Sequence, residues 1–470
     1  MYLVAALQKT QTVHRKQRLK FCVLLIALLM PSAVQAAGPL WWPQWRGPNG
    51  TGAVSNGNPP IEWDATKNIR WKTPVPGRGH STPVIVGSRI FLTAAVPFGE
   101  TFAPRSSGRP GAHDNLDVSQ KHRFIGLAID RNTGRILWQK TLHEAIPEEG
   151  AHRSASLASA SPVADTEHVF FFFGSHGLYC LDHNGRIVWK RQLGQMRTKH
   201  GHGEGASPAL SGRTLVVNWD HEGQSFILAL DKATGEEIWR RNRDEVTSWS
   251  SPLIVSDPER TQVIVCGTSR VRGYDLATGQ TVWECGGLSA NIVATPVHAD
   301  GILVVGSSYE IRSMLAIRLA DAHGDLTDSK NILWSRRRGT PYVPSPLLYD
   351  GALYFHAHYQ SVMTRVNAAT GADSPGAFRL PGFGNVYASA IGAGGRVYVT
   401  DLTGTTVVFT NEDEPQFLAR NVLDDVVSAS AAVAQNDLYL RGERFLYCIS
   451  ETPAPGDPCL IRSFPGITPS

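Results

Sequence analysis

The sequence contains few cysteines, and none is in a spacing typical of a functional site. Six are present, and apart from Cys22 in an N-terminal apolar run they show no CxxC spacing, no CxxCH sequence and no adjacent pair. The chain therefore carries no haem-attachment sequence and no CxxC chemistry. Cys448 and Cys459 are close enough in sequence to form a disulfide in an oxidising compartment; for Cys180, Cys266 and Cys285, buried free thiols are the alternative.

The chain also lacks an apolar run long enough to span a membrane comfortably. Its longest apolar segment, residues 21–30, follows a basic stretch and precedes small residues at 34–36. This order is typical of a secretory signal, so we predict a signal peptide at residues 1–36 and a periplasmic or secreted protein. A retained N-terminal anchor is the alternative. No membrane span is expected in the mature chain.

A strong excess of charge of one sign is missing as well. The formal charge of +4 arises in segment 1–36, which holds five basic residues and no acid, so the rest has 40 bases against 41 acids. A nearly neutral protein gives no electrostatic reason to expect a nucleic acid or an anionic lipid as a partner.

What the chain does have is a repeated unit of a strand, an Asp-x-x-(Thr)-Gly turn, and a second strand ending in tryptophan. It reads LAIDRNTGRILW up to Trp138, LYCLDHNGRIVW up to Trp189, LALDKATGEEIW up to Trp239 and RGYDLATGQTVW up to Trp283. The aspartate favours the turn and glycine takes its positive-φ position. A period of about 45–50 residues predicts an all-β propeller, whose units cannot bury their apolar faces alone.

Two further series count eight blades. Each first strand opens with Ser/Thr-Pro or Ser-Ala, at Thr82, Ser161, Ser207, Ser251, Thr295, Ser345, Ser389 and Ser430, and each second strand is an apolar run. The last unit stops after its third strand at Ser450, while a spare strand containing Trp71 lies near the N-terminus. We therefore predict an eight-bladed propeller of four-stranded antiparallel blades, closed where the N-terminal strand joins the strand containing Tyr447.

The predicted organisation follows from this count. The regions are a signal peptide at 1–36, an N-terminal extension at 37–65, the propeller at 66–452 with a long loop insertion at 95–122, and a C-terminal tail at 453–470.

The repeat resembles the pyrroloquinoline quinone (PQQ) repeat over residues 66–452. That family contains quinoprotein alcohol dehydrogenases and the non-enzymatic propeller lipoprotein of the outer-membrane β-barrel assembly machinery. The opening WWPQWRGPNGTG, from Trp41 to Gly52, is similar to a group of exported PQQ-like propellers of unestablished activity. The dehydrogenases typically have a disulfide between adjacent cysteines and a Glu/Asn/Asp calcium site with a catalytic aspartate. This chain has no Cys-Cys, and no residues map onto that acidic set.

Loops on one face of the propeller are expected to form the site. This face carries the inter-blade links and the links between second and third strands. The candidate residues are Arg78, His80, His200, His202, Glu204, Asp220, His221, Trp249, Asn291, Tyr342 and Tyr387. The long insertion could fold over them as a lid.

Each candidate has a simpler reading. His200 and His202 have the spacing of a metal chelate, yet no third ligand is suitably spaced, so no metal site is predicted. Asp220 and His221 suit acid–base chemistry or an ordinary hydrogen-bonded loop. Trp249, Tyr342 and Tyr387 either stack on a flat ligand or pack together.

No catalytic residue is identified. The favoured hypothesis is a monomeric, exported scaffold that binds a small-molecule ligand or another exported protein on its loop-rich face. No cofactor is assigned. The alternative is a PQQ-dependent dehydrogenase acting on an alcohol or sugar, with PQQ and calcium bound. A hydrolase lacks any nucleophile–base spacing.

Overall fold

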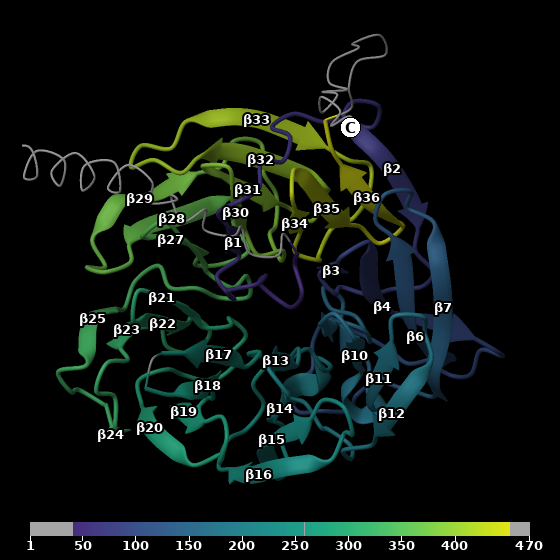
Figure 1. Ribbon diagram of the computed structural model, residues 1–470, viewed down its shortest axis with the longest axis horizontal. Helices are drawn as coiled ribbons and strands as arrows, with labels where there is room; N and C mark the ends of the chain where they lie inside the picture. The colour runs from purple at the N-terminus through teal and green to yellow at the C-terminus, as the bar shows by residue number, and fades with distance from the viewer. Residues whose placement is uncertain (1–40, 258, 452–470) are drawn as a thin grey trace, which may run out of the picture. The chain divides into compact units, whose positions relative to one another are not determined.

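The computed structural model describes residues 41–257 and 259–451. Within them, eight sheets of four or five strands follow one another around a ring, which confirms the predicted eight-bladed, all-β propeller (Figure 1). The four strands of each blade pair antiparallel, while the added fifth strands β1 and β24 pair parallel with their neighbours. The signal peptide predicted at 1–36, the tail at 453–470 and Cys459 lie outside the described residues. The described residues contain no helix of the length and apolar character that a membrane span requires.

The first four blades are given from the centre outward. Blade one has β3 (Val84–Val86), β4 (Arg89–Phe98), β6 (Lys121–Asp130) and β7 (Ile136–Ala145). Blade two has β9 (Val163–Ala164), β10 (His168–Phe172), β11 (Leu178–Asp182) and β12 (Ile187–Arg191). Blade three has β13 (Ala209–Ser211), β14 (Thr214–Trp219), β15 (Ser225–Asp231) and β16 (Glu237–Arg243). Blade four has β17 (Leu253–Ser256), β18 (Thr261–Cys266), β19 (Val271–Asp275) and β20 (Thr281–Cys285), with β24 (Gly324–Asp325) on its outer edge.

The last four blades continue the ring. Blade five has β21 (Val297–Ala299), β22 (Ile302–Ser307), β23 (Ser313–Arg318) and β25 (Ile332–Arg336). Blade six has β26 (Leu347–Tyr349), β27 (Ala352–His356), β28 (Val362–Asn367) and β29 (Asp373–Arg379). Blade seven has β30 (Ile391–Ala393), β31 (Arg396–Thr400), β32 (Thr405–Thr410) and β33 (Phe417–Val422), with β1 (Ala53–Val54) added on its inner edge. Blade eight has β34 (Ala432–Ala434), β35 (Asp437–Arg441) and β36 (Phe445–Ile449), followed by β2 (Ile69–Pro74) as its outer strand.

Blade eight is built from both ends of the described chain. β2 pairs antiparallel with β36, and Trp71 lies opposite Cys448 while Lys72 lies opposite Tyr447. In Figure 1 the purple β2 runs beside the yellow β36. Residues 69–74 therefore supply the outer strand that the last unit of the sequence lacks.

At five blade boundaries, a tryptophan of the outer strand of one blade contacts the turn of the next blade, whereas the outer strands of blades six and seven contain no tryptophan. The Trp189 indole Nε1 donates to the Lys232 carbonyl at 2.8 Å, and the ring covers Gly235 in the turn of blade three. Gly235 has φ +72°, and a Cβ there would lie 2.6 Å from the ring, so glycine supplies both the conformation and the room. Trp71, Trp138, Trp239 and Trp334 make the same contact with the following blade.

Blade four departs from this rule. The Trp283 Nε1 donates to the Gln262 side chain of its own blade at 2.7 Å. The apolar clusters lie between adjacent sheets, for example Phe171 and Tyr179 of blade two against Phe91 of blade one. Neighbouring blades therefore share their hydrophobic cores, as the repeat predicts.

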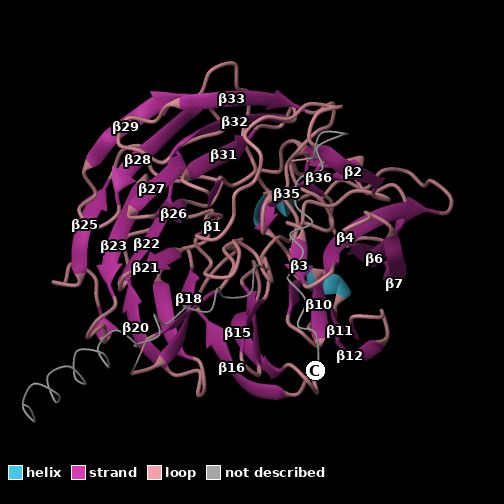
Figure 2. Ribbon diagram, turned by 45° about the horizontal axis from the view of Figure 1, so that its top comes forward, coloured by secondary structure: helices cyan, strands magenta, loops and turns pink. Residues whose placement is uncertain are grey.

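The long link of blade one is shorter than the 95–122 expected from sequence. β4 continues to Phe98 and β6 begins at Lys121, because the two strands stay paired beyond the neighbouring hairpins. Within the link, β5 (Asn115–Leu116) pairs with β8 (Ala151–His152) of the connection to blade two. This two-stranded sheet joins the long link to the connection that leads into blade two. Figure 2 shows that the described residues consist of strands and loops with only small helical turns. Short 3-10 turns lie at η1 (Gly174–His176) and η2 (Lys199–Gly201).

Candidate functional site

The hydroxyl groups that open the first strands form a hydrogen-bonded ring around the channel. The backbone N–H of Thr82 donates to Ser161 Oγ, that of Ser161 to Ser207 Oγ, and that of Ser207 to Ser251 Oγ, at 2.9–3.0 Å. The series resumes from Thr295 to Ser345, Ser389 and Ser430, at 2.8–2.9 Å. Each of the six serine hydroxyls thus joins two blades as an acceptor and keeps its own proton to donate, whereas the Thr82 hydroxyl donates to the Ser430 carbonyl at 3.0 Å.

The N-terminal segment 41–54 closes one end of the channel. It contacts the inner strands of several blades: Trp42 bridges to Ile85 of β3, and Leu348 and Gly392 donate to the carbonyls of Thr51 and Gly52. Figure 1 shows this purple segment at the centre of the ring beside β30 and β34. The channel is therefore a blind pocket with a floor made by the segment.

Arg46 holds the floor in place. Its guanidinium is buried and donates to the Ala390 and Pro346 carbonyls, both at 2.8 Å, so it links blades six and seven. Burial lowers the pKa of Arg46 to about 9. Gly52, at φ +82°, passes so close that a Cβ would overlap the guanidinium, which explains the need for glycine in the PNGTG sequence.

Above this floor lies a cavity of about 240 Å³. Seven of the eleven candidate residues line it: His80, His202, Glu204, Trp249, Asn291, Tyr342 and Tyr387. Five of the ring serines, Ser207, Ser251, Ser345, Ser389 and Ser430, also face it. Among the described lining residues there is no lysine, arginine or aspartate, so Glu204 is the one carboxyl group of the cavity wall.

Aromatic side chains from blades five to seven form one wall. Tyr342 stacks on Tyr309 with centroids 6.2 Å apart and planes within 9°, and Tyr359 packs against both Tyr342 and Tyr387. Burial raises the pKa of the Tyr342 hydroxyl, and burial followed by Tyr342 raises that of Tyr359. These phenols are neutral at ordinary pH, so the wall presents flat, uncharged surfaces.

Histidines lie on the side of blades one to three. The rings of His113, His152 and His202 lie within 4.8–6.1 Å of one another, and His202 also lies 6.4 Å from Trp249. Burial, and then repulsion from the neighbouring histidines, lowers the pKa of His202 to about 4. Burial and the nearby Arg78 and Arg441 lower that of His80 to about 3.

Glu204 is held by a fixed set of donors. Its Oε2 accepts the Ser175 backbone N–H at 2.7 Å and its Oε1 accepts the Ser175 hydroxyl. Burial raises the pKa of Glu204 to about 7, although both Ser175 bonds act in the opposite direction. Asn291 lies ahead of the first strand of blade five. Its buried Oδ1 has no described hydrogen-bond partner, and its backbone has a φ of +58°.

Four candidates do not line the cavity. Arg78 forms an ion pair with Glu443 at 3.2 Å. The His200 ring lies 5.3 Å from the His202 ring, at the edge of the cavity. Asp220 is fully buried in a two-point ion pair with Arg243, at 2.7 and 3.0 Å, and also accepts the Ser248 hydroxyl. His221 is buried and bonded to the Arg197 N–H and the Gln224 carbonyl. Asp220 and His221 thus stabilise the link between β14 and β15.

The comparisons agree with this architecture. A family model described as outer membrane protein assembly factor BamB, built on the PQQ repeat, matches residues 125–374, more than half of the chain. The chain belongs to this family. No curated protein matches the sequence.

Solved structures resemble this family member in fold. A europium-containing methanol dehydrogenase has a TM-score of 0.59 at 11% identity and covers 87% of this chain and 90% of its own. Quinohemoprotein alcohol dehydrogenase from Comamonas testosteroni has a TM-score of 0.60 at 10% identity, and the match covers 90% of this chain and 82% of the dehydrogenase. BamB from Moraxella catarrhalis has a TM-score of 0.35 at 16% identity, and the match covers 71% of this chain and 80% of that BamB chain. The two dehydrogenase structures support the propeller fold.

Several residues of the pocket were not among the candidates. His113 and His152 come from the long link of blade one and from β8, and Tyr309 and Tyr359 come from links between second and third strands. Trp45 comes from the floor. These tyrosines and histidines could have been chosen as candidates because they lie in links of the loop-rich face. The path of the long link that carries His113, however, could not be derived from its sequence.

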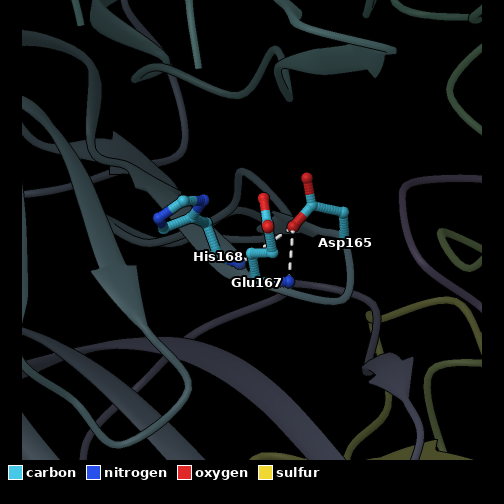
Figure 3. Close-up of side chains that lie close together, drawn as sticks. All are labelled: Asp165, Glu167 and His168. Atoms are coloured by element: carbon cyan, nitrogen blue, oxygen red, sulfur yellow. Dashed lines mark hydrogen bonds between the residues drawn. The ribbon is translucent and has the colours of Figure 1, made fainter. Parts of the chain in front are cut away.

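Acidic and histidine side chains also meet at the turn between β9 and β10. Asp165, Glu167 and His168 place their ligand atoms within 4.8 Å of one another (Figure 3). The Asp165 carboxylate accepts the Glu167 and His168 backbone N–H groups, both at 2.8 Å, and pairs with the Lys232 ammonium. Lys232 also lies 3.6 Å from Glu167, so one ammonium contacts both carboxylates of this turn.

Proposed function

We propose that this BamB-family propeller is an exported binding protein that takes a small, uncharged, oxygen-rich ligand such as a monosaccharide in its central pocket and carries out no chemistry on it. Export is supported by the basic and apolar segments within residues 1–36 and by the outer membrane in the description of the family. The observation that carries the proposal is the pairing of stacked aromatic faces with a ring of hydroxyl donors.

The aromatic wall suits the apolar face of a sugar ring. Tyr342 and Tyr387 present flat surfaces, and Trp249 is fixed because its Nε1 donates to the Gly203 carbonyl at 2.7 Å. Rigid aromatic side chains give a large contact area at low cost in conformational entropy.

The hydroxyl ring suits the oxygens of the same ligand. Ser345, Ser389 and Ser430 each accept a backbone N–H, and none donates to another described residue. Their protons therefore remain for a ligand oxygen, which is the kind of contact that fixes orientation in a small-molecule site.

The size and charge of the cavity restrict the ligand further. About 240 Å³ is below the about 300–1,000 Å³ typical of pockets for drug-sized molecules, so a ligand of monosaccharide size fits best. The described lining has no lysine or arginine, and an anionic ligand would lose hydration without gaining a permanent counter-charge.

A titration followed by tryptophan fluorescence and calorimetry tests the proposal. D-glucose, D-galactose and N-acetyl-D-glucosamine are compared with glucose 6-phosphate, and at least one neutral sugar is expected to bind more tightly than the phosphate. Tyr342→Ala should weaken that binding about 10-fold or more, since one aromatic contact is removed. Phe417→Ala, at an exposed aromatic of β33 outside the pocket, is the matched control. Equal effects of the two substitutions, or absence of binding by all three sugars, would refute the proposal.

A PQQ-dependent dehydrogenase is the second candidate, favoured by Glu204 and Asn291 in the pocket wall. These are two of the three residue types in the Glu/Asn/Asp set expected from the resemblance. The rest of the wall does not fit the group. No aspartate lines the described cavity, and neither lysine nor arginine is present there to balance the three carboxylates of PQQ. The described cysteines are separate, buried thiols. Dye reduction by the purified protein with PQQ, calcium and an alcohol or sugar would establish this candidate instead.

A further inference from the structure

Four histidines from three separate segments gather at the rim of the pocket. His113 comes from the long link of blade one, His152 from β8, and His200 and His202 from the link to blade three. The ring centroids of His113, His200 and His202 lie 4.8, 5.3 and 5.9 Å apart. A tetrahedral ion with metal–nitrogen distances of about 2.1 Å holds imidazole centroids about 5 Å apart.

The hydrogen bonds of these histidines fix their tautomers. The Nδ1 of His113 lies 2.8 Å from the Gly111 carbonyl, and the Nδ1 of His200 lies 3.0 Å from the Pro110 carbonyl. A carbonyl oxygen accepts and never donates, so each Nδ1 carries a proton. In the neutral ring Nε2 then keeps its lone pair.

His202 is fixed in the same way through Asn115. The Asn115 Nδ2 donates to the His200 and Gly201 carbonyls at 2.8 and 3.1 Å, which sets the orientation of the amide. Its Oδ1 therefore faces the His202 Nδ1, at 2.8 Å, and accepts the proton of that nitrogen. In all three neighbouring histidines, an oxygen thus accepts the Nδ1 proton and the lone pair of Nε2 is free to bind a metal. This arrangement is usual for metal-ligating histidine.

The backbone around His200 has an unusual conformation and close contacts with the His200 side chain. His200 has φ +59°, a left-handed conformation that side chains other than glycine adopt rarely, and Gly201 follows at +64°. Gly111 approaches so closely that a Cβ there would lie 2.6 Å from the His200 Nδ1. Strained conformations of this kind persist where the surroundings hold them, often at functional sites.

Charges nearby are already paired. Arg153 pairs with Asp114 at 3.5 Å, and Arg109 pairs with Glu149 at 3.5 Å. His152 differs from the other three, because its Nδ1 receives the Ser154 backbone N–H at 3.2 Å. Its Nε2 therefore carries the proton, and His152 borders the cluster without the ligand tautomer.

We propose that His113, His200 and His202 bind a divalent transition metal of the zinc, copper or nickel type through their Nε2 atoms. Imidazole is a preferred ligand of these ions, and three protein ligands leave a fourth coordination position open. The ring nitrogens of these three histidines do not all lie within 4.8 Å of one another in the described structure. Binding therefore requires the rings to rotate until the three Nε2 atoms converge, and the exposed His113 on the long link has the freedom to do this. His113 and His202 also line the pocket proposed to bind the sugar, but metal binding is measured without any sugar, so the two proposals can fail separately.

The test uses the full, tag-free protein stripped with a chelator. Equilibrium dialysis with Zn²⁺, Ni²⁺ or Cu²⁺ separately, and the visible spectrum with Co²⁺, are expected to show one bound equivalent with nitrogen coordination. His113→Ala and His202→Ala should each weaken binding about 10-fold or more. Asn115→Ala should weaken it to a lesser degree, because the tautomer of His202 is no longer fixed.

Two control variants separate this site from other histidines. His323 is exposed and has the same arrangement, with Nδ1 3.1 Å from the Val282 carbonyl, but it belongs to blade four. His168 belongs to the acidic turn of Figure 3. His323→Ala and His168→Ala are expected to leave the affinity unchanged. The proposal is overturned if no stoichiometric ion binds, or if either control weakens binding as much as His113→Ala.

Discussion

Trp45 and Thr295, 250 residues apart in the chain, are joined by a hydrogen bond of 3.0 Å from the indole Nε1 to the hydroxyl. Thr295 opens the first strand of blade five, and in the other members of this part of the ring the hydroxyl accepts a backbone N–H from the preceding blade. At this one position of the described ring, the N-terminal segment supplies the donor. The floor of the pocket is therefore part of the hydrogen-bonded ring.

Two substitutions of Trp45 should lower the free energy of unfolding by different amounts. Trp45→Phe keeps most of the ring area and removes the indole N–H, for an expected loss of about 1 kcal/mol in the free energy of unfolding. Trp45→Ala also removes the packed ring and should cost about 2 kcal/mol or more. Guanidinium unfolding measures both. Trp41→Phe is the control, since Trp41 packs between blades one and two without a described indole hydrogen bond.

The contact between Trp239 and the turn of blade four is expected to be a main source of stability. The indole is buried, its Nε1 donates to the Leu276 carbonyl at 2.8 Å, and the ring covers Gly279. Trp239→Ala should cost about 3–5 kcal/mol. Gly279→Ala should also destabilise, because φ is +70° and a Cβ would lie 2.5 Å from the indole. In the double variant the two losses should not add, since both disrupt one contact. Strict additivity in unfolding experiments would argue against this interpretation.

Asp220 should behave as a structural residue. Its side chain and that of Arg243 are completely buried, so Asp220→Ala leaves an uncompensated guanidinium, at an expected cost of about 3–5 kcal/mol. Glu144→Ala removes the exposed partner of Arg123 and should cost less than about 1 kcal/mol. Ligand affinity of the folded fraction of Asp220→Ala should equal that of the wild type. A selective loss of affinity with unchanged stability would place Asp220 in the binding site.

The turn of blade one gives a pH dependence of defined sign. The Thr133 backbone N–H is the largest of the contacts that lower the pKa of Asp130 below its usual value. Since the folded pKa lies below the unfolded value of about 3.9, the stabilisation is complete above that value. It is lost as the pH falls through the folded pKa.

Asp130→Asn tests this dependence without removing the turn. Asn367 occupies the equivalent position in blade six, where its Oδ1 accepts the Ala369 and Thr370 N–H groups at 3.1 and 3.0 Å. Wild type should have the higher melting temperature near pH 6, and the difference should shrink toward pH 2. A difference that is constant over this range would contradict the assignment.

The blade count could be predicted from sequence because the repeat acts locally or on its nearest neighbour. The aspartate and glycine of each unit shape one turn, and the tryptophan contacts the turn of the next blade. The candidate site could be predicted in part for a related reason. Residues just ahead of the Ser/Thr-Pro positions, such as His202 and Trp249, are brought to the pocket by the strand that follows them.

The remaining features depend on contacts between distant segments. Asp220 and His221 look like a polar site in sequence, and the partner that buries Asp220, Arg243, lies at the end of β16, 23 residues later. His113 approaches His202 because β5 pairs with β8 inside a long link without periodicity. The sequence of residues 41–54, rich in tryptophan and glycine, shows no pattern that identifies the channel as the place it occupies.

Thermal unfolding of the full protein with separate ligands tests the central claim, that the pocket binds a neutral ligand, most directly. A ligand that binds the native state raises the melting temperature in a concentration-dependent way. We predict an increase with at least one of the neutral sugars, an increase that Tyr342→Ala abolishes, and no increase with PQQ and calcium. An increase with PQQ and calcium, accompanied by none with the sugars, would contradict the account.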